Sequence, residues 1–136
     1  MVPVTIRWAR EDDHAEILRL RRTCHRRGGP LDLHLFAVLA AEADGVIVGY
    51  SLFAFAPGEK GWACYGIDHG VAVSWRRQGI GRRLHEERCR VARENSAVDF
   101  IGTVKRGNAP MIRILEACGQ TYRSSGAGRD FYIGAL

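Results

Sequence analysis

The 136-residue sequence predicts a mixed α/β (α+β) fold, in which helices cover a central sheet. Two observations predict it. Segments with strand-like apolar patterns alternate with segments of helical periodicity in the order β-α-β-β-β-α-β-α-β-β, which combines an antiparallel meander with crossovers through helices. The apolar content of 46% supports one sizeable core, and the length leaves no room for two ordinary domains. We therefore expect a single domain over residues 1–136.

The first half of the chain predicts a strand, a helix and a hairpin. Residues 4–8 alternate between apolar and polar side chains, and the amphipathic helix that follows is expected to stop at Gly28-Gly29-Pro30. Its later turns are rich in arginine, which we interpret as a solvated face: Arg19, Arg21, Arg22, Arg26 and Arg27. Two β-prone runs, 36–42 and 46–55, are joined by Ala43-Asp44-Gly45, a typical hairpin turn.

The second half predicts further strands separated by two helices. Leu84 and Val91 are expected to face inward from the first of these helices. Asn108 and Pro110 suit the beginning of the second helix, and Gly119 its end. The expected strands are 62–73, 98–104, 120–123 and 131–133, and the expected helices are 81–93 and 106–119.

The stretch from Val71 to Leu84 predicts an anion site, because an apolar strand runs into a basic, glycine-containing turn and then into a helix. Backbone N–H groups at the start of a helix have no intrahelical partner and carry the positive end of its dipole, and glycines let a phosphate come close. Gly79-Ile80-Gly81 lacks the third glycine of the dinucleotide motif, and no GxxxxGK[ST] is present. A solvated basic turn is the alternative.

The charge and composition of the sequence indicate which classes of partner the protein could bind. The net charge of +5 suggests an anionic partner, which could be a nucleic acid, an acidic acceptor or a phosphorylated cofactor. We find no recognition helix and no surface of interleaved aromatics, which argues against nucleic acid. The longest apolar stretch, 46–56, is too short to span a bilayer, and no signal peptide is visible. The four cysteines are scattered and the histidines have no metal-like spacing, so we expect a cytoplasmic protein without a metal or a membrane.

The motif Arg76-x-x-Gly79-x-Gly81 resembles the pyrophosphate-binding motif of the GCN5-related N-acetyltransferase (GNAT) family. The order of elements, the hairpin sequence of residues 42–50 and the asparagine before the last helix are also similar. The resemblance implies a mixed, mostly antiparallel central sheet with helices on both faces. It further implies transfer of an acetyl group from acetyl-coenzyme A to a primary amine. The short segment before Phe36 indicates that the family's second helix is abbreviated or absent.

The resemblance also implies which residues hold the coenzyme. Backbone amides from Arg77 to Arg82 would bind the pyrophosphate, and the backbone of Val71 and Val73 would bind the pantetheine arm. The implied coenzyme-binding residues are Val71, Val73, Arg76, Arg77, Gln78, Gly79, Ile80, Gly81, Arg82 and Asn108.

The catalytic groups are less well defined. Deprotonating a lysine-like amine at pH 7 costs roughly 4.6 kcal/mol, so a base is useful. His69, on the strand before the turn, is the candidate general base, with a structural histidine as the alternative. In the family, a tyrosine seven residues after the asparagine commonly protonates the thiolate, but that position here is Leu115.

Three functions therefore stay open. The first is an N-acetyltransferase acting on a small-molecule or peptide amine, with a homodimer allowed. The second is a non-catalytic module that binds acyl-coenzyme A, and the third is a basic nucleic-acid-binding domain.

Overall fold

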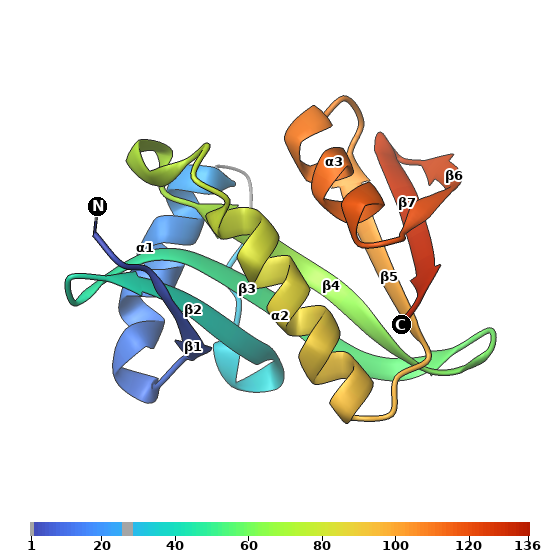
Figure 1. Cartoon of the computed structure of the whole chain (residues 1–136), viewed down its shortest axis with the longest axis horizontal. Coiled ribbons are helices and arrows are strands. Elements are labelled where there is room, and N and C mark those ends of the chain that lie inside the picture. The colour runs from blue at the N-terminus through green and yellow to red at the C-terminus, as the bar shows by residue number, and fades with distance from the viewer. Residues whose placement is uncertain (1, 26–28) are drawn as a thin grey trace. The chain divides into compact units, whose positions relative to one another are not determined.

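The computed structural model describes residues 2–25 and 29–136, and its elements follow the predicted order (Figure 1). The strands are β1 (Thr5–Trp8), β2 (Ala37–Ala43), β3 (Val46–Gly58), β4 (Gly61–Val71), β5 (Asp99–Lys105), β6 (Thr121–Gly126) and β7 (Arg129–Ala135). The α-helices are α1 (His14–Cys24), α2 (Ile80–Glu94) and α3 (Ala109–Ala117), and short 3-10 turns cover Glu11–Asp13, Leu33–Leu35 and Val73–Trp75.

The strands form a seven-stranded sheet in the order β1-β2-β3-β4-β5-β7-β6. β1 pairs antiparallel with β2, and β7 pairs antiparallel with both β5 and β6. β4 pairs parallel with β5 from Ala63 opposite Asp99 to Tyr65 opposite Ile101. The predicted α/β class and the mixed, mostly antiparallel sheet are confirmed.

Several boundaries differ from the sequence-based expectation. The strand expected to reach Val73 ends at Val71, because the next residues form the 3-10 turn Val73–Trp75, which Trp75 N closes on Ala72 O. Helix α1 ends at Cys24, before the glycines expected to stop it, of which Gly28 lies outside the described residues.

The hairpin between β2 and β3 forms as predicted. Asp44 and Gly45 both have positive φ, 50° and 76°, which matches the twist of a tight hairpin turn. Between α1 and β2, where the sequence suggested that a second helix is abbreviated or absent, the described residues 29–36 contain the 3-10 turn Leu33–Leu35.

The chain divides into two compact units, and we describe each by itself. Unit 1 comprises Met1–Leu52 and Asp68–Leu84, and unit 2 comprises Phe53–Ile67 and His85–Leu136. Strands β3 and β4 and helix α2 each contribute residues to both units.

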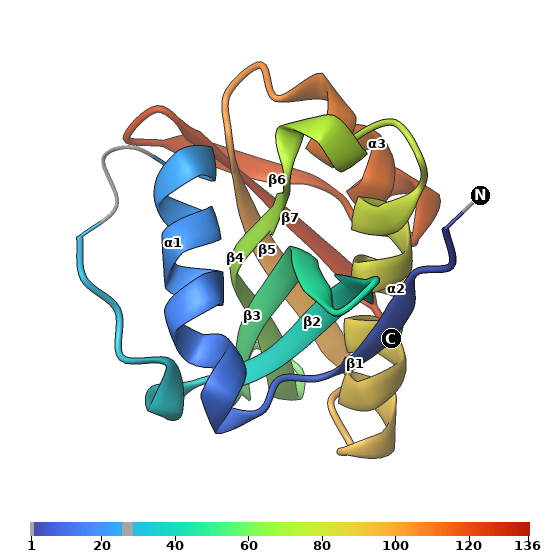
Figure 2. The same ribbon diagram turned by 90° about the vertical axis from the view of Figure 1, so that its left-hand side faces the viewer.

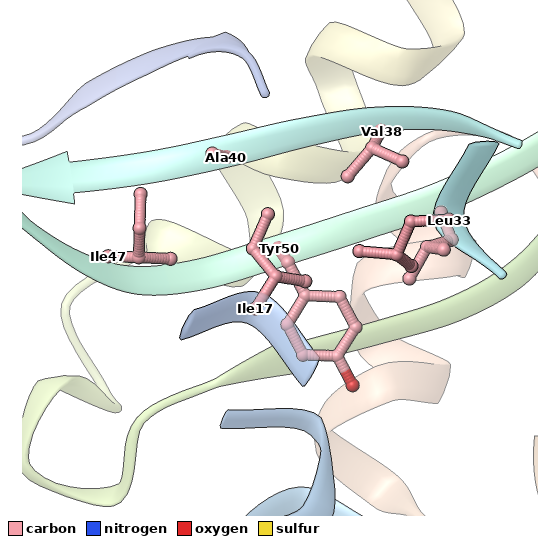
Figure 3. Close-up of a cluster of buried hydrophobic side chains, with 7 residues drawn as sticks. Ile17, Leu33, Val38, Ala40, Ile47 and Tyr50 are labelled. Carbon is pink, nitrogen blue, oxygen red and sulfur yellow. The ribbon is translucent and has the colours of Figure 1, made fainter. Parts of the chain in front are cut away.

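Unit 1 has helices on both faces of its strands (Figure 2). On one face, Ile17 of α1 packs with side chains of β2 and β3 (Figure 3), in a buried cluster formed by Ile17, Leu33, Val38, Ala40, Ile47, Tyr50 and Leu52. On the other face, a Cβ added to Gly49 would lie 3.1 Å from Leu84 Cδ1 at the start of α2. The burial of Leu84 and Val91 agrees with the inward orientation predicted for them.

Unit 2 is built around β5, which pairs with β7 from Asp99 opposite Ala135 to Lys105 opposite Arg129. Phe100 and Val104 of β5 and Leu115 of α3 are buried. Within the described residues, no helix is both long enough and apolar enough to cross a membrane.

Candidate functional site

The predicted anion turn lies in unit 1, where β4 is followed by a 3-10 turn and then by α2. Arg77 and Gly79 adopt positive φ, 63° and 80°, so the backbone curls just before the helix begins at Ile80. The amide of Arg83 donates to Gly79 O at 3.0 Å, and the amides of the three preceding residues therefore point out of the N-terminal end of α2. A Cβ placed on Gly79 would meet nothing within 4 Å, so this side of the turn is open.

The arginines of the turn fall into two groups. Arg76 folds back, and its Nε donates to Val71 O at 2.9 Å. Arg83 reaches Val4 O, to which its Nη2 donates at 2.8 Å. Arg77 and Arg82 have exposed side chains at the turn. The first pair fastens the turn to the rest of unit 1, and the second pair contributes positive charge at its surface.

The other implied coenzyme residues occupy different settings. Val71 is the last residue of β4, and Cys24 Sγ lies 3.7 Å from its carbonyl oxygen. Val73 lies in the 3-10 turn with 71% of its surface exposed, so it is not a strand residue as expected. Gln78 is exposed in the turn. Asn108 belongs to unit 2, where its Oδ1 accepts a hydrogen bond from Met111 N and caps α3.

His69, the candidate base, has hydrogen-bond partners at both ring nitrogens. Nε2 lies 2.9 Å from Gly81 O, which can only accept, so this nitrogen carries the proton. Nδ1 lies 3.2 Å from the hydroxyl of buried Ser51, which can donate or accept. The imidazole thus ties β4 to the first turn of α2, next to the anion turn.

Asp68 forms a second, unexpected centre on the opposite face of β4, which we call the Asp68 cluster (Arg21, His25, Tyr50 and Asp68). Its Oδ1 lies 2.8 Å from His25 Nε2 and accepts from Tyr50 Oη at 3.2 Å and from the amide of His69 at 2.8 Å. Its Oδ2 is paired with Arg21 Nε. The carboxylate is 9% exposed and the arginine 13%, so this is a nearly buried ion pair.

The contacts of the Asp68 cluster shift its pKa values. Burial by itself would raise the pKa of Asp68, but the hydrogen bond and charge of His25 and the hydrogen bond of Arg21 outweigh it and lower the pKa to about 2. The hydrogen bond to Asp68 raises the pKa of His25 above 6.5. Burial raises the pKa of Tyr50 above its ordinary value. The cluster thus keeps an ionised carboxylate at neutral pH, with a half-exposed histidine at its edge.

The sequence analysis missed this centre because it assigned all the arginines of α1 to a solvated face. That interpretation is wrong for Arg21. A usable signal was present, since Arg21 follows the buried Ile17 by one helical turn and therefore lies on the same face of α1.

Unit 2 contains a second buried polar group, which we call the His85 cluster (His85, Arg88, Cys89 and Gln120). Arg88 Nε donates to His85 Nδ1 at 2.8 Å, so His85 Nε2 carries the proton and donates to Gln120 Oε1 at 2.6 Å. The guanidinium of Arg88 lies 4.7 Å from the ring centre of Phe100. Burial, helped by the charge of Arg88, lowers the pKa of His85 from 6.5 to about 3. The imidazole is therefore neutral in the folded chain.

Leu115, at the position of the family's tyrosine, is 1% exposed in the core of unit 2. A Cβ built on Gly102 would lie 3.9 Å from its Cδ2. A larger, polar side chain at this position would have to displace packed atoms.

Comparisons with known proteins agree with the fold and identify the family. The chain matches the acetyltransferase (GNAT) family model over residues 4–120. No curated protein sequence matches it. Among solved structures, it is similar to a ribosomal-protein-alanine N-acetyltransferase from Brucella melitensis, with 25% identity, a TM-score of 0.80, and coverage of 97% of this chain and 99% of that one.

Two further similar structures contain coenzyme groups. One is the paia N-acetyltransferase from Thermoplasma acidophilum in complex with coenzyme A, at 11% identity and a TM-score of 0.81, covering 98% of this chain and 99% of that one. The other is Arabidopsis thaliana Naa50 in complex with the bisubstrate analogue CoA-Ac-MVNAL, at 18% identity and a TM-score of 0.78, covering 98% and 97%. Since the family model spans most of the sequence, the chain belongs to the GNAT family of acetyltransferases.

Proposed function

We propose that the chain is an N-acetyltransferase that moves the acetyl group of acetyl-coenzyme A to a primary amine of a small molecule or a peptide. The observation that carries this proposal is the turn from Arg76 to Arg82, with helix amides that precede the first intrahelical hydrogen bond and an open glycine. We place the enzyme in the cytoplasm and assign it no metal for the transfer step.

The turn fits the group that it would hold. A pyrophosphate needs several N–H donors that converge on one point, and the amides of Ile80, Gly81 and Arg82 converge at the positive end of a 15-residue helix. Arg77 and Arg82 add charge, and Gly79 leaves space for close approach. Coenzyme A supplies the acetyl thioester, and the chain's own part is to bind and orient it and to receive a proton from the amine.

The names of similar proteins support peptide acceptors as the first ones to test. The Brucella protein is named for an alanine of a ribosomal protein, and the Arabidopsis protein holds CoA-Ac-MVNAL. Neither name identifies the acceptor of this chain.

His69 is our candidate base from the sequence, and its hydrogen bonds support a role in positioning as well. Replacing it with asparagine removes the link from β4 to Gly81 O. If the ring serves as the base, kcat falls and the rise of rate with pH is lost. If it serves only to anchor the turn, KM for acetyl-coenzyme A rises and the pH profile keeps its shape.

His25 is the alternative base, favoured by one observation. It is half-exposed, and Asp68 holds its Nε2 at 2.8 Å, an arrangement that fixes the ring and leaves Nδ1 as the acceptor. Asp68 also raises its pKa, so the rate would rise with pH through a value above 6.5. Loss of this rise in His25→Asn but not in His69→Asn would assign the base to His25.

The binding half of the proposal is tested by thermal unfolding with and without acetyl-coenzyme A. At a ligand concentration of 100 Kd, native-state binding adds about 2.7 kcal/mol, which should raise Tm clearly. Gly79→Val should abolish the rise. Gly128→Val is the matched control, because Gly128 also has positive φ, 75° against 80°, with nothing within 4 Å of its Cβ position. An equal rise of Tm in both variants would place the coenzyme elsewhere.

The catalytic half is tested by release of free coenzyme A thiol with a panel of peptides, polyamines and amino acids. Turnover with at least one amine supports the enzyme. Coenzyme binding without acetylation of any amine would favour the non-catalytic binding module, which the absence of a tyrosine at Leu115 already makes a specific alternative.

A further inference from the structure

The beginning of α1 and the 3-10 turn before β2 bring two histidines and a glutamate together in unit 1. Glu11, in the 3-10 turn Glu11–Asp13, precedes His14, the first residue of α1, by three residues, so the two side chains lie close together. His34 approaches from the 3-10 turn Leu33–Leu35. One donor atom from each of the three lies within 4.8 Å of the other two.

The geometry of the three donors is close to that of a metal centre. His34 Nε2 lies 2.8 Å from Glu11 Oε2, and His14 Nδ1 lies 3.9 Å from the same oxygen. The ring centres of His14 and His34 are 4.9 Å apart, at an angle of 65°. Ligands of one tetrahedral zinc ion are about 3.4 Å apart, given bonds of 2.0–2.1 Å. Donors that are up to 4.8 Å apart must approach by up to about 1.4 Å, and His34 Nε2 and Glu11 Oε2 must separate from 2.8 Å, shifts that rotation of the exposed Glu11 and His34 side chains can supply.

Asp32 contacts the ring nitrogen of His34 that would not bind the metal, as carboxylates behind metal-binding histidines usually do. Its Oδ1 lies 2.9 Å from His34 Nδ1 and also accepts from the amide of His34 at 3.0 Å. This contact fixes the proton on Nδ1 and turns Nε2 towards Glu11 and His14.

From these contacts we propose that Glu11, His14 and His34 bind one zinc ion, with Asp32 as the carboxylate behind His34. Two imidazoles and one carboxylate form a set that suits zinc, and solvent would fill the fourth position. The ion would replace the Nε2 proton of His34 while the contact of Nδ1 with Asp32 remains. It would tie residues 11–14, at the start of α1, to residues 32–34, just before β2.

The test is a zinc titration of the purified, chelator-treated full chain by calorimetry, with circular dichroism to verify folding of each variant. Wild type should bind one equivalent. His34→Ala and His14→Ala should each weaken binding at least tenfold, and Glu11→Gln should also weaken it. Asp32→Asn should also weaken binding, but by less than either histidine variant does. His25→Ala is the matched control, since His25 is a half-exposed histidine of the same unit outside this site.

Cobalt replaces zinc as a spectroscopic probe, because the chain also has four thiols that bind metals. The proposed site should give the visible bands of a tetrahedral nitrogen–oxygen site without thiolate-to-cobalt charge transfer. Zinc binding that is unchanged in His34→Ala, or a strong charge-transfer band, would overturn the proposal. So would a wild-type chain that retains no more zinc than the His14→Ala/His34→Ala double variant.

Discussion

The two compact units each contain a buried polar cluster with a histidine, but the histidines have opposite neighbours. In unit 1, His25 faces the carboxylate of Asp68, and its pKa is raised. In unit 2, His85 lies beside the guanidinium of Arg88, and burial lowers its pKa to about 3. The same residue type is thus favoured as a cation in one unit and kept neutral in the other.

The difference gives the two units opposite responses to pH. A raised histidine pKa adds stability that is complete below pH 6.5 and is lost as the pH rises through the folded pKa. A lowered histidine pKa adds stability that is complete above pH 6.5 and is lost as the pH falls towards 3. Burial, helped by Arg88, therefore decides the response of His85, whereas the hydrogen bond to Asp68 outweighs burial at the half-exposed His25.

The largest loss of stability is expected when the carboxylate of Asp68 is removed from its cluster. Asp68→Asn leaves Arg21, 13% exposed, without its carboxylate, and breaking a buried ion pair costs about 3 kcal/mol or more. Urea unfolding at pH 7 measures the loss. Glu59→Gln is the control, because Glu59 pairs with Arg123 at an exposed site and should cost less than about 1 kcal/mol. Equal losses in the two variants would show that the Asp68 pair contributes no more than a surface contact.

Two glycines of β4 allow the clusters to be perturbed separately. A Cβ on Gly70 would lie 2.8 Å from Tyr50 Cε1 and 2.9 Å from Cys24 Sγ, and one on Gly66 would lie 2.7 Å from Phe100 Cζ and 3.1 Å from Arg88 Nη1. Each Gly→Ala change should cost about 1–3 kcal/mol of unfolding free energy through overpacking.

The Gly66→Ala/Gly70→Ala double variant tests whether the clusters are independent. If they are, its loss of unfolding free energy equals the sum of the two single losses within about 0.5 kcal/mol. Gly126→Ala, with nothing within 4 Å of the added Cβ, serves as the control. A clear departure from additivity would mean that the two clusters do not act separately.

The pH response of the His85 cluster comes next in size. With folded and unfolded pKa values of about 3 and 6.5, His85 should cost about 2 kcal/mol of stability between pH 7 and pH 5. His85→Asn should remove this part of the slope, even though the variant is less stable at pH 7. Urea unfolding of both proteins at the two pH values gives the difference. An unchanged slope would mean that another group takes up the proton.

The smallest effect concerns His25. Its stabilising contribution should fall as the pH rises above 6.5, by well under about 1 kcal/mol because the side chain is 45% exposed. Thermal unfolding between pH 6 and pH 8.5 should show a decline in wild type that is reduced in His25→Asn. A steeper decline in the variant would give His25 the wrong sign and remove the contrast with His85.

The sequence predicted the order of elements because periodicity and turn residues are local. Asp44-Gly45 predicted the position of the hairpin, and the spacing of Leu84 and Val91 predicted the buried face of α2. The two clusters were not predicted, because their partners are distant in sequence: Arg21 and Asp68 are 47 residues apart, and His85 and Gln120 are 35 apart. An arginine facing solvent and one paired with a buried carboxylate look the same until the tertiary contacts are known.

For the candidate site, too, the sequence indicated the local features but not the contacts between distant residues. The basic turn before α2 was recognisable because its chemistry is carried by consecutive residues. The contacts of His69 with Ser51 and Gly81, and the grouping of His34 with Glu11, depend on folding and left no local pattern.

The placement of the cysteines makes the natural chain suitable for chemical labelling. Cys24 in unit 1 and Cys118 in unit 2 are partly exposed, whereas Cys64 and Cys89 are buried, with pKa values raised to about 12 and about 11. Because alkylating reagents attack the thiolate, the buried pair should react only when unit 2 opens. Cys24, whose sulfur lies 3.8 Å from Arg76 Nη2, stands beside the turn proposed to hold the coenzyme. Its alkylation rate therefore offers a readout of ligand occupancy that requires no engineered residue.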